Sequence, residues 1–302
     1  MSGDTVRAAA IVEKAESSYG SKSRVLYGMD RGMMLHLAGE YERSNAILEQ
    51  VEEEVDRLYT KSIRSETAAF LTNDTSLPYE GEPYEHVMLN VVKALNYVAL
   101  GQLNESLVEA RRIDHRLNVL TDRAKDSSAY HEDGFARYLT GVLYESAGDL
   151  NNAFIAYRKA YEAYEAMRGW AHLPPPGQLR GDLLRTAEAL QLTTELEEYR
   201  RQFPDTPWQS REAVHGLAQV LLISYNGRAP HKEDRFLDLP ISLDALQLVL
   251  LNRGLSPPGA RSPQQRGVDS VLYGLNGHVV RVALPRLVPQ PRASWSTWPP
   301  AR

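Results

Sequence analysis

The stretch Gly141–Ala160, GVLYESAGDLNNAFIAYRKA, carries the pattern that decides the fold. Gly141 is followed by Tyr144 three positions later and by Gly148 seven positions later. On a helix, a small residue lets a partner helix approach closely, and a large residue three positions on fills the groove on the same face. Gly148 then supplies the positive φ that ends the helix. The second half again carries small and bulky residues at helical spacing, at Ala153, Tyr157 and Ala160. The stretch therefore predicts two antiparallel helices joined by a glycine turn.

The same pattern occurs twice earlier, in Gly32–Val51 around Gly39 and in Ala94–Ile113 around Gly101. One such pair is compatible with any antiparallel helix pair, but three in one register favour a repeat, which resembles the tetratricopeptide repeat. The turn glycines lie 62 and 47 residues apart, whereas a regular array has about 34, so we expect longer helices or inserts between the units. We predict a mainly α fold over residues 1–205, a tetratricopeptide-like antiparallel helix-pair array (an α-solenoid).

Two further segments complete the predicted helical domain. Thr5–Ser18 is Ala-rich and amphipathic, and we expect it to be the second helix of a pair whose first helix is missing from this chain. After the break LPPPG at residues 173–177, residues 181–189 and 195–202 predict a closing helix pair that ends at Phe203-Pro204.

Residues 206–302 are predicted to form a small β-containing segment that is rich in Pro and Arg and partly disordered at its end. Residues 218–230 predict a buried strand with an Asn-Gly turn, and residues 235–242 and 278–289 predict two more strands. Residues 253–302 hold seven Arg, no Lys and one acid, a net charge of +6, which leaves −11 for residues 1–252 out of the total of −5. The arginines are scattered without aromatic platforms, so we expect no nucleic-acid partner.

The sequence carries no motif for catalysis or cofactor binding. It has no cysteine, which excludes disulfides, thiolate metal sites and cysteine nucleophiles. It also lacks a phosphate-binding glycine loop, a nucleophile elbow and the zinc-binding HExxH pattern. His131-Glu132-Asp133 groups three types of metal ligand, but adjacent residues on a helix point in different directions, so we interpret the triplet as a polar helix start. We predict no enzyme activity, no cofactor and no metal.

The candidate binding surface is an apolar groove along the first helices of the three units. If the repeat register holds, its residues are Met29, Met33, Val91, Leu95, Tyr138 and Val142. A large exposed apolar groove promotes aggregation. We therefore expect it to be covered by the insert at residues 72–85, by the C-terminal segment or by a partner's hydrophobic segment. Glu109, Arg111 and Arg112, on a second helix, are interpreted as a solvated or salt-bridged face.

The insert at residues 72–85, TNDTSLPYEGEPYE, interrupts the helices with turn-forming residues. Two interpretations remain open for it. The first is a solvated connecting loop. The second is a segment that folds over the groove and adds Tyr79, Glu82 and Tyr84 to the binding site, because long loops in compact domains are often functional.

Three strings resemble an uncharacterised family of bacterial tetratricopeptide-repeat envelope (lipo)proteins. They are TNDTSLPYEGEPYEHVMLNVVKALNYVALGQLNESLVEARRID at 72–114, KEDRFLDLPIS at 232–242 and VRVALPRLVPQP at 280–291. The resemblance covers about residues 8–290 and implies an envelope scaffold on the periplasmic side of a bacterial membrane, without a defined activity. Members typically begin with a lipoprotein signal and an acylated cysteine, and some are encoded beside an outer-membrane lipoprotein that activates peptidoglycan synthases.

These observations predict a non-enzymatic scaffold or adaptor that binds a protein or peptide partner and serves assembly or regulation of the bacterial cell envelope. The chain has no apolar run long enough for a transmembrane helix, and its N-terminus lacks the apolar run of a secretory signal. Membrane tethering would therefore need an upstream lipoprotein signal. The alternative is a ligand-binding module or hydrolase that acts on envelope carbohydrate or lipid in the apolar groove, with acids such as Glu80, Glu82 and Glu85.

Overall fold

The computed structural model describes residues 4–69, 78–123, 132–171, 174–217, 220–223, 231–240 and 279–288. The chain divides into two compact units, Met1–Leu217 and Ala218–Arg302. The first unit contains helices α1 (Thr5–Lys14), α2 (Glu16–Tyr19), α3 (Arg24–Leu37), α4 (Tyr41–Ala69), α5 (Pro83–Ala99), α6 (Leu103–Arg123), α7 (Gly134–Ser146), α8 (Leu150–Ala171), α9 (Gly177–Ala189), α10 (Thr193–Gln202) and α11 (Arg211–Val214), with a 3-10 turn, η1 (Ser21–Ser23). The division lies after Leu217 rather than at 205/206, because α11 packs against α9.

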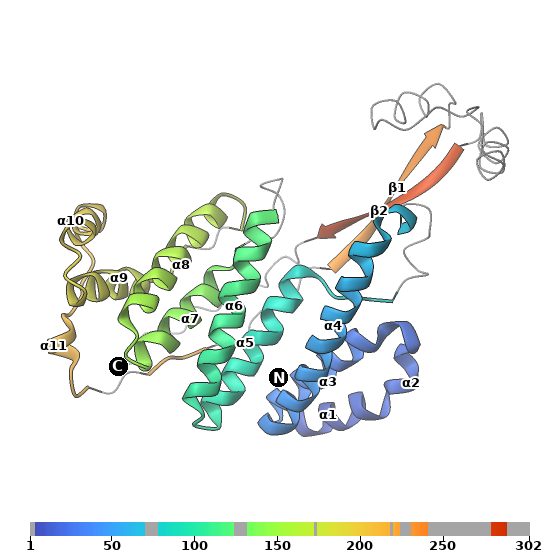
Figure 1. The fold of residues 1–302 in the computed structure, drawn as a ribbon, viewed down its shortest axis with the longest axis horizontal. Coiled ribbons are helices and arrows are strands. Elements are labelled where there is room, and N and C mark those ends of the chain that lie inside the picture. Colours follow the sequence, from blue (N-terminus) through green and yellow to red (C-terminus); the bar gives the residue numbers. More distant parts are fainter. Residues whose placement is uncertain are drawn as a thin grey trace. The chain divides into compact units, whose positions relative to one another are not determined.

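The helices form antiparallel pairs that pack side by side in chain order (Figure 1). The pairs are α3–α4, α5–α6, α7–α8 and α9–α10, and the second helix of each of the first three pairs contacts the first helix of the next pair. This arrangement confirms the predicted tetratricopeptide-like array, including its closing pair. α1 packs against α3 as α4 packs against α5, so α1 takes the place of a second helix relative to the pair that follows.

The turn inside each pair has one backbone geometry. Gly39, Gly101 and Gly148 have φ of +81°, +71° and +81°, and Gln191 takes the same place in the fourth pair with φ of +58°. In each turn, the N–H after this residue donates to the carbonyl five positions earlier, over 2.8–2.9 Å: Glu40 to Leu35, Gln102 to Tyr97, Asp149 to Tyr144, and Leu192 to Ala187. The three glycines have open space where a Cβ would lie, so the left-handed backbone and not crowding requires glycine there.

Small residues inside the helices allow close approach within the pairs, as the sequence predicts. A Cβ added at Gly32 would lie 2.4 Å from Leu48, and one added at Gly141 would lie 2.4 Å from Tyr157. Ser44, which replaces the usual alanine in the first pair, is fully buried, and its Oγ donates to the carbonyl of Gly32 over 2.7 Å. The Ser44 hydroxyl can therefore be buried between the two helices, because it donates a hydrogen bond to a backbone carbonyl of the partner helix.

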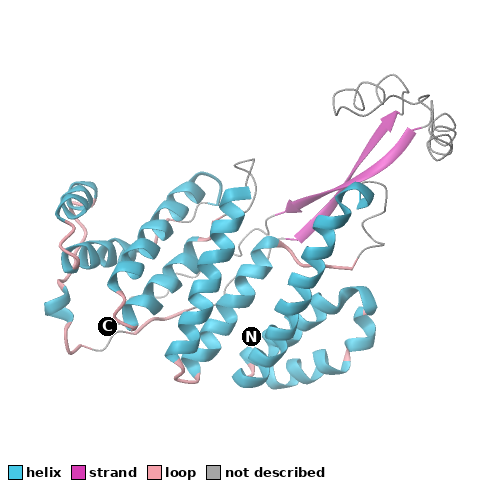
Figure 2. Ribbon diagram, viewed as in Figure 1, coloured by secondary structure: helices cyan, strands magenta, loops and turns pink. Residues whose placement is uncertain are grey.

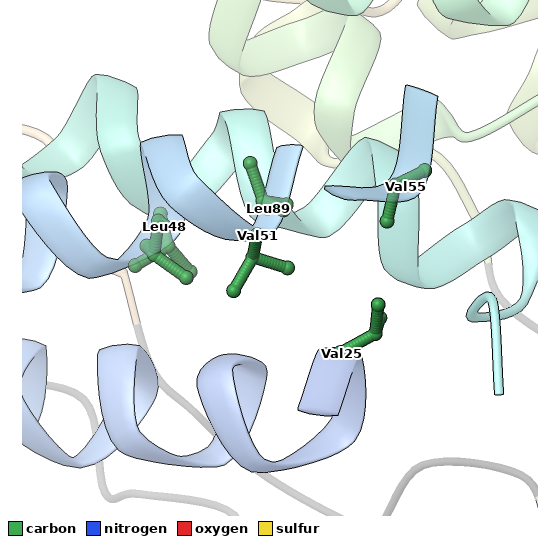
Figure 3. Packing of buried hydrophobic residues seen from close by; sticks show 6 residues of the cluster. Val25, Leu48, Val51, Val55 and Leu89 are labelled. Carbon is green, nitrogen blue, oxygen red and sulfur yellow. The ribbon is translucent and has the colours of Figure 1, made fainter. Parts of the chain in front are cut away.

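An aliphatic core links the first pair to the second. Val25 on α3, Val51 and Val55 on α4, and Leu89 on α5 belong to one buried cluster. Figure 3 shows Val25 pointing toward the α4 valines. Burying a side chain of this size contributes roughly 1.5–3 kcal/mol. Neither pair buries its apolar face alone, so stacking of the pairs supplies the core.

In the second unit, β1 (His231–Pro240) and β2 (Val279–Val288) pair antiparallel, with His231 opposite Val288 (Figure 2). The predicted buried strand at 218–230 is wrong at residues 220–223. These residues are not in a strand, and Val220 is 92% exposed, so this stretch is not a buried strand. The remaining residues of that predicted strand, the loop at 256–267 and the last residues, 291–302, lie outside the described residues.

Candidate functional site

The structure places the predicted groove residues of α3 and α5 in different environments. Met29 and Met33 are half-buried and pack against the aliphatic core between α3, α4 and α5. A Cβ at Gly81 would lie 3.2 Å from Cε of Met29, so the end of the insert lies over Met29. Val91 is only 1% exposed, which corrects its assignment to an accessible groove. The reason is that α5 contacts α3, α4, α6 and α7 and leaves little free surface.

A short apolar row remains on the first helices. Met33, Leu95 and Val142 come directly after the small packing residues Gly32, Ala94 and Gly141 of their helices. All three are half-buried. Val98, one turn after Leu95, is 46% exposed. Because α5 contacts both α3 and α7, the first helices that carry these positions are neighbours in the array.

Tyr138, predicted to line the groove, instead joins two helix pairs. Its hydroxyl on α7 donates to Oδ2 of Asp182 on α9 over 2.7 Å. Burial and the Asp182 carboxylate together raise the pKa of Tyr138 above its ordinary range. Tyr138 therefore acts as a neutral hydrogen-bond donor between helices.

The described end of the insert builds the start of α5. The N–H of Tyr79 donates to the carbonyl of Lys22 over 2.8 Å, and its hydroxyl donates to Oε2 of Glu85 over 2.5 Å. The same carboxylate accepts the N–H of Glu82 over 2.8 Å, which forms a capping box. Burial, with Glu85 and Glu82 nearby, raises the pKa of Tyr84 to about 12. Glu82 and Glu85 thus act in the helix cap, while residues 72–77 lie outside the described residues.

A buried ammonium group joins the first two helix pairs. Lys93 on α5 is fully buried, and its Nζ atom lies 2.9 Å from Oε2 of Glu52 on α4 and 3.1 Å from Oε1 of Glu109 on α6. It also pairs with Glu49 on α4. Burial works against the charge on Lys93, but its hydrogen bonds to Glu49 and Glu52 outweigh burial and raise its pKa. Arg112 on α6 pairs with the same three carboxylates.

Asn90 and Arg116 complete this cluster. The Asn90 amide donates to Glu52 over 3.0 Å and to Glu109 over 2.9 Å, and its oxygen accepts from Nε of Arg116 over 2.8 Å. Nη2 of Arg116 lies 2.8 Å from Oε1 of Glu52. Three cations therefore face three buried or half-buried glutamates, so the cluster is close to charge balance. The predicted salt bridging is confirmed for Glu109 and Arg112, but Glu109 is buried at the junction and does not lie on a solvated face.

Each later junction between pairs has its own buried guanidinium. Arg137 on α7 is fully buried, with Nη1 2.7 Å from Oδ1 of Asp114 on α6 and Nη2 2.8 Å from Oε1 of Glu132. Arg185 on α9 donates from Nε and Nη2 to the two oxygens of Glu145 on α7, both over 2.8 Å. Such two-point contacts fix direction as well as distance. The ionic clusters thus set the register between neighbouring pairs.

These buried cations were not predicted from the sequence. Lys93 stands between Val92 and Ala94, within the mainly apolar stretch 87–95 of its helix. The signal in the sequence was a lysine at a position that faces the core. Such a residue stays buried only if acids on neighbouring helices pair with it. Its partners in α4 lie more than 40 residues away in sequence, so spacing alone could not identify them.

Two surface grooves lie within the described residues. One, of about 430 Å³, lies between α4, the α5–α6 turn and α6, and its walls include the acids Glu42 and Glu105. The other, of about 670 Å³, lies between the end of α9 and α11. The first groove is lined mainly by residues of the second helices, α4 and α6, whereas the predicted binding surface lies on the first helices.

The triplet at 131–133 is a helix start in its described part. The Asp133 carboxylate accepts the N–H of Ala136 over 2.8 Å and caps α7, while Glu132 binds Arg137. Across the described ranges, no group of His, Asp and Glu side chains is arranged to hold a metal ion. No helix in the described part of the chain is long and apolar enough to span a membrane.

These helix pairs, with their left-handed turn residues and close small-residue contacts, define a tetratricopeptide-type helical array. Distant structural similarity is found to BtubC (BKLC) from P. vanneervenii, at 12% identity and a TM-score of 0.33, covering 75% of this chain and 98% of that one. It is also found to MamA (AMB-1), at 16% identity and a TM-score of 0.28, covering 61% and 99%. No protein-family model matches the sequence, and no curated protein is significantly similar to it. The fold assignment rests on the helix-pair geometry.

Proposed function

We propose that this chain is a non-enzymatic protein-binding scaffold or adaptor. The observation that carries the proposal is the array itself, in which consecutive helix pairs are held in fixed register by buried Lys93, Arg137 and Arg185. Stacked helix pairs create extended surfaces of the kind that repeat proteins use for binding. A rigid register supports binding because less conformational freedom is lost when a partner docks.

The contact surface is the apolar row of Met33, Leu95, Val98 and Val142. These residues come from three consecutive first helices, and exposed Val98 gives the row a point that water reaches in the free protein. Apolar side chains at the centre of an interface contribute most when the partner excludes water from them.

The proposed setting is the bacterial cell envelope, on its periplasmic side, in assembly or regulation. The resemblance of residues 72–114, 232–242 and 280–291 to tetratricopeptide envelope proteins supports this setting. Fractionation of cells that carry the gene with its own upstream DNA tests it. Recovery of the protein with membranes or periplasm is expected, and recovery only in the cytoplasm would remove the envelope from the proposal.

Photo-crosslinking tests the binding function. A photoreactive amino acid replaces Val98 in the full-length chain, produced in the encoding bacterium, and a matched chain carries it at Val6, which is 61% exposed on α1. We expect a discrete protein adduct from position 98 that is absent from position 6. Equal adducts from both positions, or none from position 98, would overturn the proposal. An adduct mass that corresponds to a glycan or lipid would favour the ligand-binding alternative.

A further inference from the structure

The second helices α4, α6 and α8 each bury one stripe of side chains against the first helix of their own pair. A Cβ at Gly32 would meet Leu48, and one at Gly141 would meet Tyr157, which identifies the covering helices. The stripe residues follow one another at intervals of four and three, and all are at most 5% exposed: Ser44, Leu48 and Val51 in α4, Ser106, Ala110 and Ile113 in α6, and Ala153, Tyr157 and Ala160 in α8.

The position after each stripe residue faces the next pair instead. Glu49 on α4 pairs with Lys93 on α5, and Asp114 on α6 pairs with Arg137 on α7. In α1 the residue in this position is Ala9, which is buried where α1 packs against α3. The repeat rule of the array therefore places the stripe of α1 one residue earlier.

This stripe of α1 is uncovered. It consists of Ala8, Ile11 and Ala15, of which Ile11 is 59% exposed and the two alanines are half-buried. Among the described elements, α3 and the adjoining α2 pack against α1, which lies at the end of the array (Figure 1). The terminal unit of a repeat array needs a polar outer face to stay soluble, so an apolar stripe at this end calls for a covering helix.

Two basic side chains border the open stripe. Arg7 and Lys14 each directly precede a stripe alanine, and their spacing of seven residues places them on one face of α1. Both are exposed, and neither forms an ion pair within the described ranges. The nearby acid Glu13 is taken up by Arg31 and Arg43. A symmetric contact between two copies of α1 would bring these free cations together, whereas an acidic helix would complement them.

We propose that the open stripe of α1 docks an amphipathic helix of a partner protein whose own apolar stripe is bordered by acids. The partner helix takes the place that a first helix holds in the other pairs. It carries large apolar side chains over Ala8 and Ala15 and a small residue opposite Ile11, because glycines lie opposite the large stripe residues of α4 and α8. Its acids lie along Arg7 and Lys14. This surface is separate from the first-helix row of the proposed function.

The test uses disulfide trapping, since the chain has no cysteine of its own. Purified full-length chains carry Ile11→Cys or, as the matched control, Val6→Cys. Val6 is 61% exposed on the same helix but lies about 140° around it from Ile11. Circular dichroism confirms that both chains are folded.

Three designed helical peptides of about 18 residues serve as probes, each with one central cysteine. The first has a leucine stripe bordered by glutamates, the second replaces the glutamates by lysines, and the third scrambles the sequence of the first. The yield of mixed disulfide at equilibrium in a glutathione buffer measures docking.

The glutamate peptide is expected to give about tenfold more mixed disulfide with the Ile11→Cys chain than either other peptide does. The Val6→Cys chain is expected to show no such preference. In the Ile11→Cys chain, Arg7→Gln with Lys14→Gln should remove the preference for glutamate over lysine, whereas Arg201→Gln with Arg211→Gln, which removes the same charge elsewhere, should keep it.

Equal yields from the three peptides, equal preferences at positions 6 and 11, or a glutamate preference that survives the loss of Arg7 and Lys14 would overturn the proposal. A disulfide-linked dimer of the Ile11→Cys chain that forms in preference to every peptide adduct would also overturn it and assign the stripe to a second copy. Crosslinking at position 98 reports on the first-helix row alone, so failure of this inference and failure of the proposed function are distinguishable.

Discussion

Lys93 on α5 binds Glu52 on α4 across 2.9 Å, with the ammonium group fully buried at the junction of the first two helix pairs. Opposite charges in such a place fix one relative position of the two helices, because any shift leaves a buried charge without its partner. The same relation recurs between Arg137 and Asp114 and between Arg185 and Glu145. Ionic contacts of this kind therefore specify the stacking of the array, while its aliphatic core provides most of the driving force.

The first prediction concerns the ammonium group. Lys93→Met leaves carboxylates buried without their cation, and the free energy of unfolding should fall by about 3–5 kcal/mol. Arg57→Met removes an exposed pair with Glu54 and should cost only ~0–1 kcal/mol. Urea unfolding followed by circular dichroism gives both values. A Lys93→Met chain as stable as the Arg57→Met chain would show that the cluster does not fix the junction.

The second prediction concerns acid stability. Burial opposes ionisation of Glu52, but hydrogen bonds from Asn90, Arg116 and Lys93 outweigh it and lower its pKa to about 2. The unfolded pKa of a glutamate is about 4.3. Since the folded value is the lower one, Glu52 contributes stability that is complete above the unfolded pKa and is lost as the pH falls toward 2.

Replacing Glu52 by Gln should therefore flatten the loss of stability between about pH 4.5 and 2. Burial raises the pKa of Glu109, which acts in the opposite direction and is present in both chains. Urea midpoints across this pH range provide the measurement, with exposed Glu53→Gln as the control. Parallel curves for Glu52→Gln and the unaltered chain would contradict the assignment.

The third prediction concerns the turn of the fourth pair. Gln191 adopts φ of +58°, where glycine has no steric cost and other residues pay about 1–2 kcal/mol. Gln191→Gly should raise the melting temperature, whereas Gly148→Ala, at φ of +81°, should lower it by a similar free energy. Calorimetry of the two variants checks the opposite signs. Two changes of the same sign would mean that the turns are not equivalent.

The fourth prediction concerns close approach within the third pair. A Cβ at Gly141 would lie 2.4 Å from the ring of Tyr157, so Gly141→Ala should destabilise the chain by roughly 1–3 kcal/mol. Gly177 has open space around the same position, and Gly177→Ala should change stability little. Thermal unfolding of both variants decides the matter, and equal effects would argue against tight packing at Gly141.

The helix pairs could be predicted from sequence because their determinants are local. Gly148 and Tyr144 belong to one turn, and their spacing identifies it directly. The fourth pair lacks the glycine, since Gln191 takes the left-handed position, and only helical periodicity revealed it. Val91 was assigned to the groove from the repeat register, which predicts the helix face of a residue. The register does not predict whether neighbouring helices cover that face, and Val91 is buried.

This helix-pair array is proposed to bind a protein through its first helices. The most direct test is the dissociation constant of the protein captured by crosslinking at position 98, measured in purified form by titration calorimetry. Val98→Asp should weaken binding by about tenfold or more, because it places a charge in a desolvated apolar contact. The matched Val6→Asp change should leave binding unaltered. Equal dissociation constants for the Val98→Asp chain and the unaltered chain would show that the partner does not bind at the first helices.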